Sequence, residues 1–140
     1  MISNFISQGS ETTHTLGAGE RTGVLSSYQS AFGKLPSTVG EWEDCLKIAN
    51  GRWPNERNVE KEAEAHLAFK DIYRRAADMD APHDNAAVTI MTYGLRPRDR
   101  RLESEQAAIR SFRAIYDQSP STAEDWDKVR AIAYSGATRD

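Results

Sequence analysis

The residues best suited to chemistry lie in two similar stretches of the chain, 51–62 (GRWPNERNVEKE) and 94–105 (GLRPRDRRLESE). Both stretches carry a glycine, a proline, an arginine and two glutamates at the same spacing. Two carboxylates about 5–9 Å apart can act as acid and base in the hydrolysis of a sugar chain. Arginines beside an aromatic ring can instead bind an anionic polymer without reacting with it. The two stretches therefore suggest either hydrolysis or polymer binding.

The paired carboxylates are Glu60 with Glu62 and Glu103 with Glu105. Both pairs recur at the expected start of a helix, where the helix dipole stabilises negative charge. A catalytic pair has no reason to occur twice, so the sequence favours a structural role and predicts that the protein is not an enzyme. A small wall-modifying hydrolase that uses these glutamates is the alternative.

The tryptophan of the first stretch is the residue that no helical pattern explains, since it lies in a turn. If the turns occupy equivalent places, their arginines line a groove suited to an anionic polymer, with the indole as a stacking platform. The predicted ligand-binding residues are Arg52, Trp53, Arg57, Arg96, Arg100 and Arg139. In the alternative interpretation the tryptophan packs on the preceding helices, and the arginines pair with Glu60, Glu103 and Asp99.

The remaining candidate groups do not form a reactive set. Cys45 aligns with two apolar positions of the internal repeat described below, which predicts a buried, inert thiol. The three histidines are scattered and lack the spaced cysteine or aspartate partners of a metal site. The loop 78–85 resembles a calcium loop only superficially, and Asp84 is expected to cap a helix. We therefore expect neither a metal nor a cofactor.

Composition limits the protein to one domain and narrows its partners. The chain has 140 residues, of which 39% are hydrophobic and 28% charged, and its net charge is −3. An acidic chain is unsuited to non-specific nucleic-acid binding, which needs a basic face. No apolar run approaches the roughly 18–20 residues of a membrane span. The first residues lack the basic and apolar regions of a signal peptide, which indicates an intracellular protein or a mature form.

The chain also repeats an internal unit of about 43 residues. Residues 27–42 align without gaps on 111–126, and a middle copy fits between them. The units are roughly 19–51, 52–94 and 95–140, each with two amphipathic helical segments. A two-helix unit cannot bury its apolar stripe alone, so the units must stack. The sequence predicts an all-α fold of three αα-hairpins, six helices in one compact domain.

Helix boundaries can be predicted from capping residues. Thr38 with Glu41 fits a capping box. The corresponding helix of the third unit begins at Ser121 or Thr122, and Ser121 with Glu124 fits a capping box there. Glycines at positions 51 and 94 are expected to end helices, because the residue after a helix C-terminus often adopts the left-handed conformation that glycine allows. The helical periodicity predicts that Trp42, Trp126 and Leu102 lie on the helix faces that pack toward the core.

The first 18 residues are polar and rich in serine, threonine and glycine, which favours a flexible N-terminal arm. A sharper interpretation is that Ile2, Phe5 and Ile6 dock onto a neighbouring copy.

Two family resemblances rest on these motifs. The runs GERTGVLSSYQSAFGKLP (19–36), KIANGRWP (47–54), DNAAVTIMTYGLRP (84–97) and RAIAYSGATR (130–139) resemble a helical domain found in predicted secreted or surface proteins of ultrasmall candidate-phylum bacteria. That resemblance covers roughly residues 19–139 and implies a surface location, but no activity.

More weakly, the unit is similar to the surface-layer homology module, in which three helical repeats anchor proteins to anionic cell-wall polymers. The matching positions are Trp42, Gly51, Pro54, Val59, Glu62, Gly94, Pro97, Leu102 and Glu105. We therefore expect a non-enzymatic module at the cell surface or outside the cell, which self-associates or holds an anionic wall polymer. An intracellular helical-repeat module that binds proteins is the alternative, and a cytoplasmic location stays open.

Overall fold

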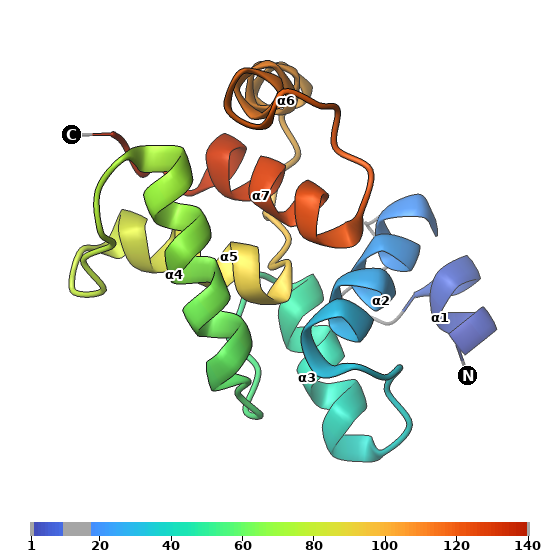
Figure 1. Ribbon diagram of the computed structural model, residues 1–140. Coiled ribbons are helices and arrows are strands. Elements are labelled where there is room, and N and C mark those ends of the chain that lie inside the picture. The colour runs from blue at the N-terminus through green and yellow to red at the C-terminus, as the bar shows by residue number, and fades with distance from the viewer. Residues whose placement is uncertain (1, 10–17, 140) are drawn as a thin grey trace.

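The computed structural model describes residues 2–9 and 18–139, and these residues form helices and turns with no strand (Figure 1). The predicted all-α class is confirmed. The helices are α1 (Ile2–Gln8), α2 (Ala18–Phe32), α3 (Val39–Ala49), α4 (Val59–Tyr73), α5 (Pro82–Tyr93), α6 (Leu102–Tyr116) and α7 (Ala123–Tyr134). Helices α2 to α7 lie where six helices were predicted, and α1 is an additional helix within the predicted arm.

Helices α5 and α7 form the centre of the packing, because they contact each other more extensively than any other pair. Each also contacts the helix before it in the chain, α4 and α6 respectively. Helix α2 contacts α3, α5 and α7, while α1 lies at the edge of the molecule beside α2 (Figure 1). Helix α2 therefore joins the N-terminal helices to the central pair.

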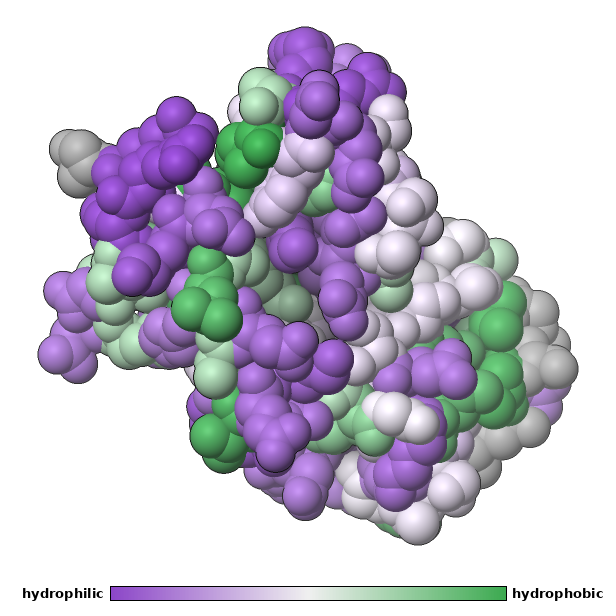
Figure 2. Space-filling view, in the orientation of Figure 1, coloured by the Kyte–Doolittle hydropathy of each residue, from purple (hydrophilic) through white to green (hydrophobic). Residues whose placement is uncertain are grey.

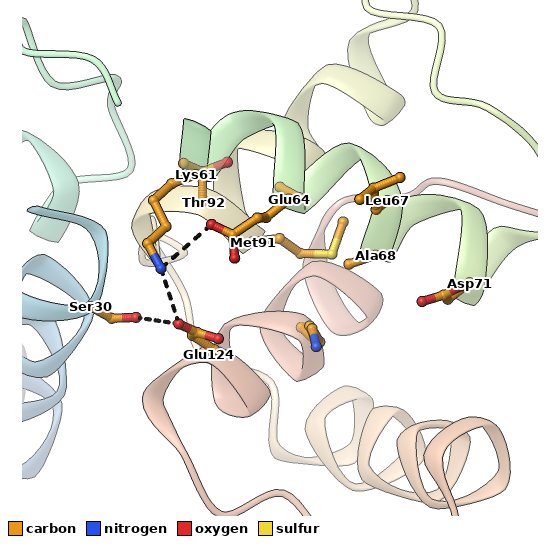
Figure 3. Close-up of a pocket in the computed structure, with 11 residues that line it drawn as sticks. Ser30, Lys61, Glu64, Leu67, Ala68, Asp71, Met91, Thr92 and Glu124 are labelled. Atoms are coloured by element: carbon orange, nitrogen blue, oxygen red, sulfur yellow. Dashed lines mark hydrogen bonds and ion pairs between the residues drawn. The ribbon is translucent and has the colours of Figure 1, made fainter. Parts of the chain in front are cut away.

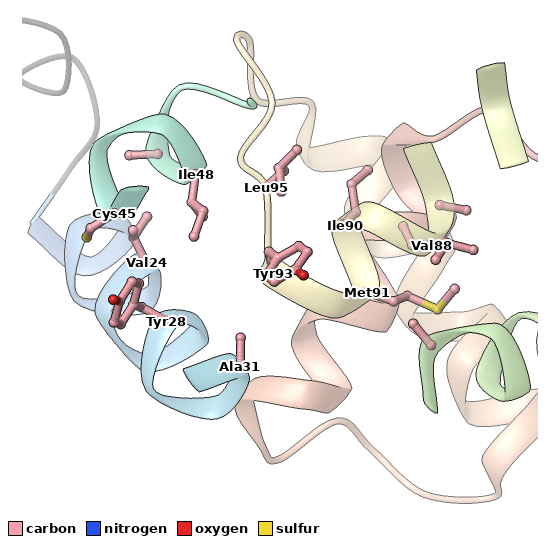
Figure 4. Packing of buried hydrophobic residues seen from close by; sticks show 14 of the residues in the cluster. Val24, Tyr28, Ala31, Cys45, Ile48, Val88, Ile90, Met91, Tyr93 and Leu95 are labelled. Carbon is pink, nitrogen blue, oxygen red and sulfur yellow. The ribbon is translucent and has the colours of Figure 1, made fainter. Parts of the chain in front are cut away.

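The main hydrophobic core gathers side chains from α2, α3, α4 and α5 (Figure 4). Val24, Ile48 and Val88 are fully buried there, and the Tyr93 ring stacks on Phe32 with its centroid 5.7 Å away. A smaller cluster of Ala108, Phe112 and Val129 joins α6 to α7. Apolar burial of this kind supplies most of the free energy that holds such helices together.

The single cysteine belongs to this core. Cys45 is fully buried, as the sequence predicts, and the burial raises the pKa of its thiol to about 12. Because the thiolate is the nucleophilic form, this group is unreactive at neutral pH.

Capping residues predict one helix start fully and a second in part. Thr38 and Thr122 each cap a helix in a full capping box, with Glu41 and Asp125 as the reciprocal partners. The first box is the predicted one, whereas the second lies one residue later than the predicted pair of Ser121 and Glu124. The prediction for Asp84 is wrong, because the cap residue of α5 is Ala81 and makes no side-chain hydrogen bond. The Asp84 carboxylate binds Arg75 and does not cap the helix: the two terminal nitrogens of Arg75 donate to it at 2.5 and 2.8 Å.

Two equivalent tryptophans differ in burial, and α1 explains the difference. Trp42 of α3 packs against the Phe5 ring, whose centroid is 5.6 Å away. Trp126 of α7 is 40% exposed, which corrects the prediction that it faces inward. Among the described residues no segment covers Trp126 as α1 covers Trp42. Leu102 is also exposed, because it is the first residue of α6 and lies at the very end of the helix.

The predicted flexible arm is only partly described. Residues 2–8 form α1, in which Phe5 is 6% exposed and Ile2 and Ile6 pack against the core. The three apolar residues of the arm thus contact their own chain, whereas the sequence suggested a neighbouring copy. Residues 10–17 of the predicted arm lie outside the described residues.

The predicted left-handed glycines are confirmed, with φ of 75° at Gly51 and 73° at Gly94. At Gly94 the backbone also passes very close to other helices. A Cβ at this position would lie 2.4 Å from the Ser27 hydroxyl oxygen and 2.7 Å from an Asp127 carboxylate oxygen. Gly33 has a similar φ of 77° but nothing within 4 Å of such a Cβ.

These two glycines form a matched pair for a stability measurement. We expect Gly33→Ala to lower the free energy of unfolding by about 1 kcal/mol, the conformational cost of a left-handed alanine. Gly94→Ala should lower it by roughly 3 kcal/mol, because steric overlap with α2 and α7 adds to the same cost. Urea unfolding followed by circular dichroism measures both. Equal losses for the two variants would contradict the close approach at Gly94.

Candidate functional site

The six predicted ligand-binding residues do not lie on one surface. Arg52 and Arg57 are exposed in the turn between α3 and α4, and Trp53 beside them is half-buried. Arg100 is exposed in the turn between α5 and α6, whereas Arg96 in that turn is fully buried. The predicted set therefore includes exposed arginines in both turns, a half-buried tryptophan and a buried arginine.

Arg57 is held by its own turn and the helix after it. Its Nε and one terminal nitrogen donate to the Glu62 carboxylate at 2.6 and 2.8 Å. The Tyr93 hydroxyl at the end of α5 donates to the same carboxylate and accepts the backbone N–H of Asn58 at 2.9 Å. The Arg57 guanidinium also lies 3.9 Å over the centre of the Trp53 ring. We call Arg57, Glu62 and Tyr93 the first clamp.

The same arrangement recurs in the second turn. Arg100 donates to the Glu105 carboxylate with nitrogen–oxygen distances of 3.0–3.1 Å. The Tyr134 hydroxyl at the end of α7 donates to that carboxylate and accepts the backbone N–H of Arg101 at 2.9 Å. Arg100, Glu105 and Tyr134 form the second clamp. The recurrent turn sequence thus builds the same hydrogen-bonded joint twice.

The clamps make these glutamates unsuited to acid–base catalysis. The Arg57 hydrogen bond is the main cause that lowers the pKa of Glu62 below its usual range. At Glu105 burial raises the pKa, but the hydrogen bonds from Arg100 and Tyr134 outweigh it and the net pKa is lowered. Both carboxylates stay ionised and already hold several donors. A general acid needs the opposite shift, so this geometry does not favour the hydrolase alternative.

Residues 19–51 lack both the glutamate and the tyrosine of the clamp. Extension of the ungapped alignment places Arg21 at the position of Glu105 and Asn50 at the position of Tyr134. The glutamate and the tyrosine are thus present together or replaced together. This correlation is the sequence signal that could have paired Glu62 with Tyr93 and Glu105 with Tyr134.

Arg96 is not a surface ligand residue, which corrects its predicted role. Its side chain is 0% exposed and lies between α2 and α7. One terminal nitrogen donates to the Gly94 carbonyl at 2.6 Å, and the Nε lies 3.3 Å from a Glu20 carboxylate oxygen. Asp127 is 3.7 Å away and also accepts from Ser27 at 3.0 Å. Sequence periodicity could not reveal this, because the counter-charge comes from a distant helix.

Burial dominates the electrostatics of this internal pair. Burial, together with repulsion from the neighbouring Arg130, lowers the pKa of Arg96 to about 10, although Asp127 and Glu20 act against that shift. Burial also raises the pKa of Asp127 to about 6, although Arg96 and Arg130 act against that shift. At neutral pH the pair is ionised, with Arg130 donating to Asp127 at 2.8 Å.

Arg139 lies far from the turn that contains Trp53. Its Nε donates to the Ile72 carbonyl at 3.1 Å, near the end of α4, whereas Trp53 precedes the start of that helix. The rise of an α-helix separates these two ends by about 20 Å. Arg75 donates to the Thr138 carbonyl at 2.8 and 3.1 Å. These contacts hold the C-terminal residues against the end of α4 and the loop after it.

A groove between the two turns brings part of the predicted site together. It encloses a volume of about 450 Å³, and we call it the turn groove. The first turn contributes Gly51 and Trp53, and α7 contributes Tyr134. The remaining lining residues come from α5 and the second turn: Pro82, Asn85, Ala86, Thr89, Ile90, Leu95, Arg96, Pro97, Arg98, Asp99 and Arg101.

The charges of the turn groove come from residues outside the predicted set. Arg98 is exposed and forms no ion pair with any described residue. The Arg101 guanidinium lies 5.4 Å over the centre of the Tyr134 ring, a cation–π contact that leaves its donors available. Asp99 is the one acid among the described residues that line the groove. The groove therefore combines two aromatic side chains with two exposed arginines, Arg98 and Arg101.

A second groove, shown in Figure 3, lies among α2, α4, α5 and α7 and encloses about 280 Å³. Lys61 crosses it, 3.5 Å from a Glu124 oxygen and 3.6 Å from a Glu64 oxygen. The Ser30 hydroxyl also donates to Glu124, at 3.3 Å. Because these polar groups bind one another across the opening, we assign the candidate site to the turn groove.

The described residues give no sign of metal chemistry or of a membrane span. Within residues 2–9 and 18–139, no three His, Cys, Asp or Glu side chains are grouped so that they could hold a metal ion. None of the helices in that part of the chain is long and apolar enough to cross a membrane. Comparisons with protein-family models, with curated proteins and with solved structures found no match. The family resemblances of the sequence therefore remain predictions.

The clamps give a paired mutational prediction. Tyr93→Phe removes a buried hydroxyl that serves both Glu62 and the Asn58 N–H, so we expect the free energy of unfolding to fall by about 1–2 kcal/mol. Tyr134→Phe should cost less, because its hydrogen bonds are more exposed to water. Thermal and urea unfolding measure both changes. A Tyr93→Phe variant as stable as the wild type would contradict the clamp.

The buried pair gives a pH prediction. Folding raises the pKa of Asp127 from 3.8 to about 6, so between these values the folded state binds more protons than the unfolded state. The contribution of Asp127 to stability therefore grows as the pH falls from about 6 to 4. Relative to Asp127→Asn, the wild type should gain free energy of unfolding over this window. Parallel pH profiles of the two proteins, measured by urea unfolding, would contradict the shift.

Proposed function

We propose that the protein is a non-enzymatic attachment module of three αα-hairpin units that binds an anionic sugar polymer in the turn groove, at the cell surface. The observation that carries the proposal is the presence of two exposed arginines and two aromatic side chains along this groove. Arg98 forms no ion pair with any described residue, Arg101 lies over Tyr134, and Trp53 lies at the first turn.

The chemistry of the groove matches the two features of such a polymer. Arginine is the side chain that binds carboxylate and phosphate groups most directly, because its planar fork donates two hydrogen bonds at once. Flat aromatic surfaces such as Trp53 and Tyr134 contact the apolar faces of sugar rings. The groove touches both recurrent turns, so an elongated ligand would contact two units of the chain.

The clamps support a binding function over a hydrolytic one. They keep Glu62 and Glu105 ionised and hydrogen-bonded, and they hold the turns that form the groove. A charged groove whose neighbouring glutamates are already hydrogen-bonded suits recognition better than acid–base catalysis. The surface location comes from the family resemblances and is tested separately, by locating the protein in cell fractions.

Substitution of Arg98 tests the proposal most directly. The wild type should bind a polyanionic sugar chain such as polygalacturonate, and Arg98→Ala should weaken that binding by about two- to fivefold with unchanged melting temperature, as expected for one solvent-exposed ion pair. Isothermal titration calorimetry at two salt concentrations measures the affinity, and thermal unfolding followed by circular dichroism measures the melting temperature. Arg110→Ala removes an exposed arginine of α6 outside the groove and is the matched control.

Neutral dextran controls for the contribution of charge. Binding of dextran as tight as that of the polyanion, or equal losses for Arg98→Ala and Arg110→Ala, would contradict the proposed site. Trp53→Ala adds a second measurement, since lost binding with an unchanged melting temperature points to ligand stacking. A lowered melting temperature would instead show that the indole serves packing against Arg57 and Tyr93.

A further inference from the structure

The surface of the described residues does not indicate a further docking site. Their large exposed hydrophobic side chains are Leu35, Val39, Val59, Leu67, Leu102 and Trp126. Away from α1, the strongly hydrophobic side chains in Figure 2 lie in small areas separated by polar ones. Scattered apolar residues of this kind are normal on a protein surface. A dipeptide at the end of α3 has more distinctive chemistry.

Asn50 and Gly51 form the one asparagine–glycine pair of the sequence. Asparagine is a thermolabile residue, because its side-chain amide can react with the backbone of its own chain. The backbone nitrogen of the next residue attacks the Cγ atom, a five-membered imide ring forms, and the amide nitrogen leaves as ammonia. Glycine as the next residue favours this reaction, because it has no Cβ to hinder the approach and its backbone adopts the widest range of conformations.

The fold places this pair at a helix end that is open to water. Asn50 is exposed and is the C-cap residue of α3, with φ of −101° and ψ of 13°. Gly51 follows in the left-handed conformation, with φ of 75°. Residues at a helix end fray, whereas those in the interior are fixed by hydrogen bonds on both sides. The water that must open the imide therefore reaches this position.

Two hydrogen bonds must break before the reaction. The Asn50 Nδ2 donates to the Leu46 carbonyl at 2.8 Å, and the Gly51 backbone N–H donates to the Ile48 carbonyl at 3.1 Å. Both bonds belong to the last turn of α3, so local opening of that turn releases them without unfolding of the whole protein. The reaction is thus slower in the folded chain than in a free peptide, and its rate depends on how often the end of α3 opens.

We propose that Asn50 is a deamidation site, at which the folded protein is slowly converted into an aspartate form and an isoaspartate form. Water opens the imide at either of its two carbonyl groups. One opening gives aspartate, and the other gives isoaspartate, in which the backbone runs through the former side chain. The net change is the loss of ammonia and the gain of water, so no oxidant or cofactor is needed. The proposal is independent of ligand binding in the turn groove.

The modification would weaken the junction between the two turns. A Cβ on Gly51 would lie 2.8 Å from the Arg96 carbonyl oxygen, and the Arg96 backbone N–H donates to the Ile48 carbonyl at 3.1 Å. Isoaspartate adds one carbon atom to the backbone directly before this close contact. Both products also lose the amide donor to the Leu46 carbonyl and place a negative charge at the C-terminal end of α3, where the helix dipole disfavours it.

Mass spectrometry of the full-length protein tests the proposal. The purified protein is incubated at mildly alkaline pH, which helps the attacking backbone nitrogen to lose its proton, and is then digested beside an unincubated sample. The peptide that contains Asn50 should gain one mass unit and become a substrate for protein isoaspartate methyltransferase. Asn55, Asn58 and Asn85 precede Glu, Val and Ala and are internal controls, which should react severalfold more slowly. Modification of Asn50 no faster than theirs would overturn the proposal.

A pair of variants tests the structural consequence. Asn50→Gln keeps an amide but has a longer side chain that does not form the five-membered ring, so its peptide should keep its mass on incubation. Asn50→Asp reproduces one product and should melt at a lower temperature than Asn50→Gln, because it adds the charge at the end of α3. Mass gain at the same peptide in Asn50→Gln would overturn the assignment of the site. Equal melting temperatures of the two variants would overturn the weakened junction.

Discussion

The buried ion pair of Arg96 and Asp127 is the interaction on which the rest of the fold depends. It joins the second turn to α7 and, through Glu20 and Ser27, to α2. Both groups are removed from water, so each needs the polar partners that these elements supply, and this requirement constrains how the second turn, α2 and α7 can meet. The close backbone approach at Gly94 lies beside the same residues, since a Cβ there would meet Ser27 and Asp127.

Local features of the fold could be predicted from the sequence because they depend on neighbours in the chain. The capping box at Thr38, the left-handed Gly51 and Gly94, and the buried Cys45 follow from short spacings and helical periodicity. The exposure of Trp126 did not follow, because periodicity gives the direction of a side chain but not the extent of the element that covers it.

The site was harder to predict because arginines have many potential partners. The sequence identified the two turns, but Arg57 and Arg100 are held by a glutamate of the next helix and a tyrosine about thirty residues further on. Arg96 pairs with a residue of α7. Once these three are assigned to internal structure, Arg98 and Arg101 remain beside Trp53 and Tyr134. The residues that recur in both turns therefore form the groove, whereas Arg98 and Arg101, which do not recur, supply its positive charge.

The hydrogen bonds at the C-terminal residues have a mechanical consequence. Arg75 holds the Thr138 carbonyl, and Arg139 holds the Ile72 carbonyl, so this end of the chain is fastened to α4 and not only to α7. A pulling force applied at Arg139 would reach the end of α4 first and would have to break these hydrogen bonds before it could unwind α7. Residues Thr138 and Arg139 thus distribute an applied force between α4 and α7, two helices from different parts of the sequence.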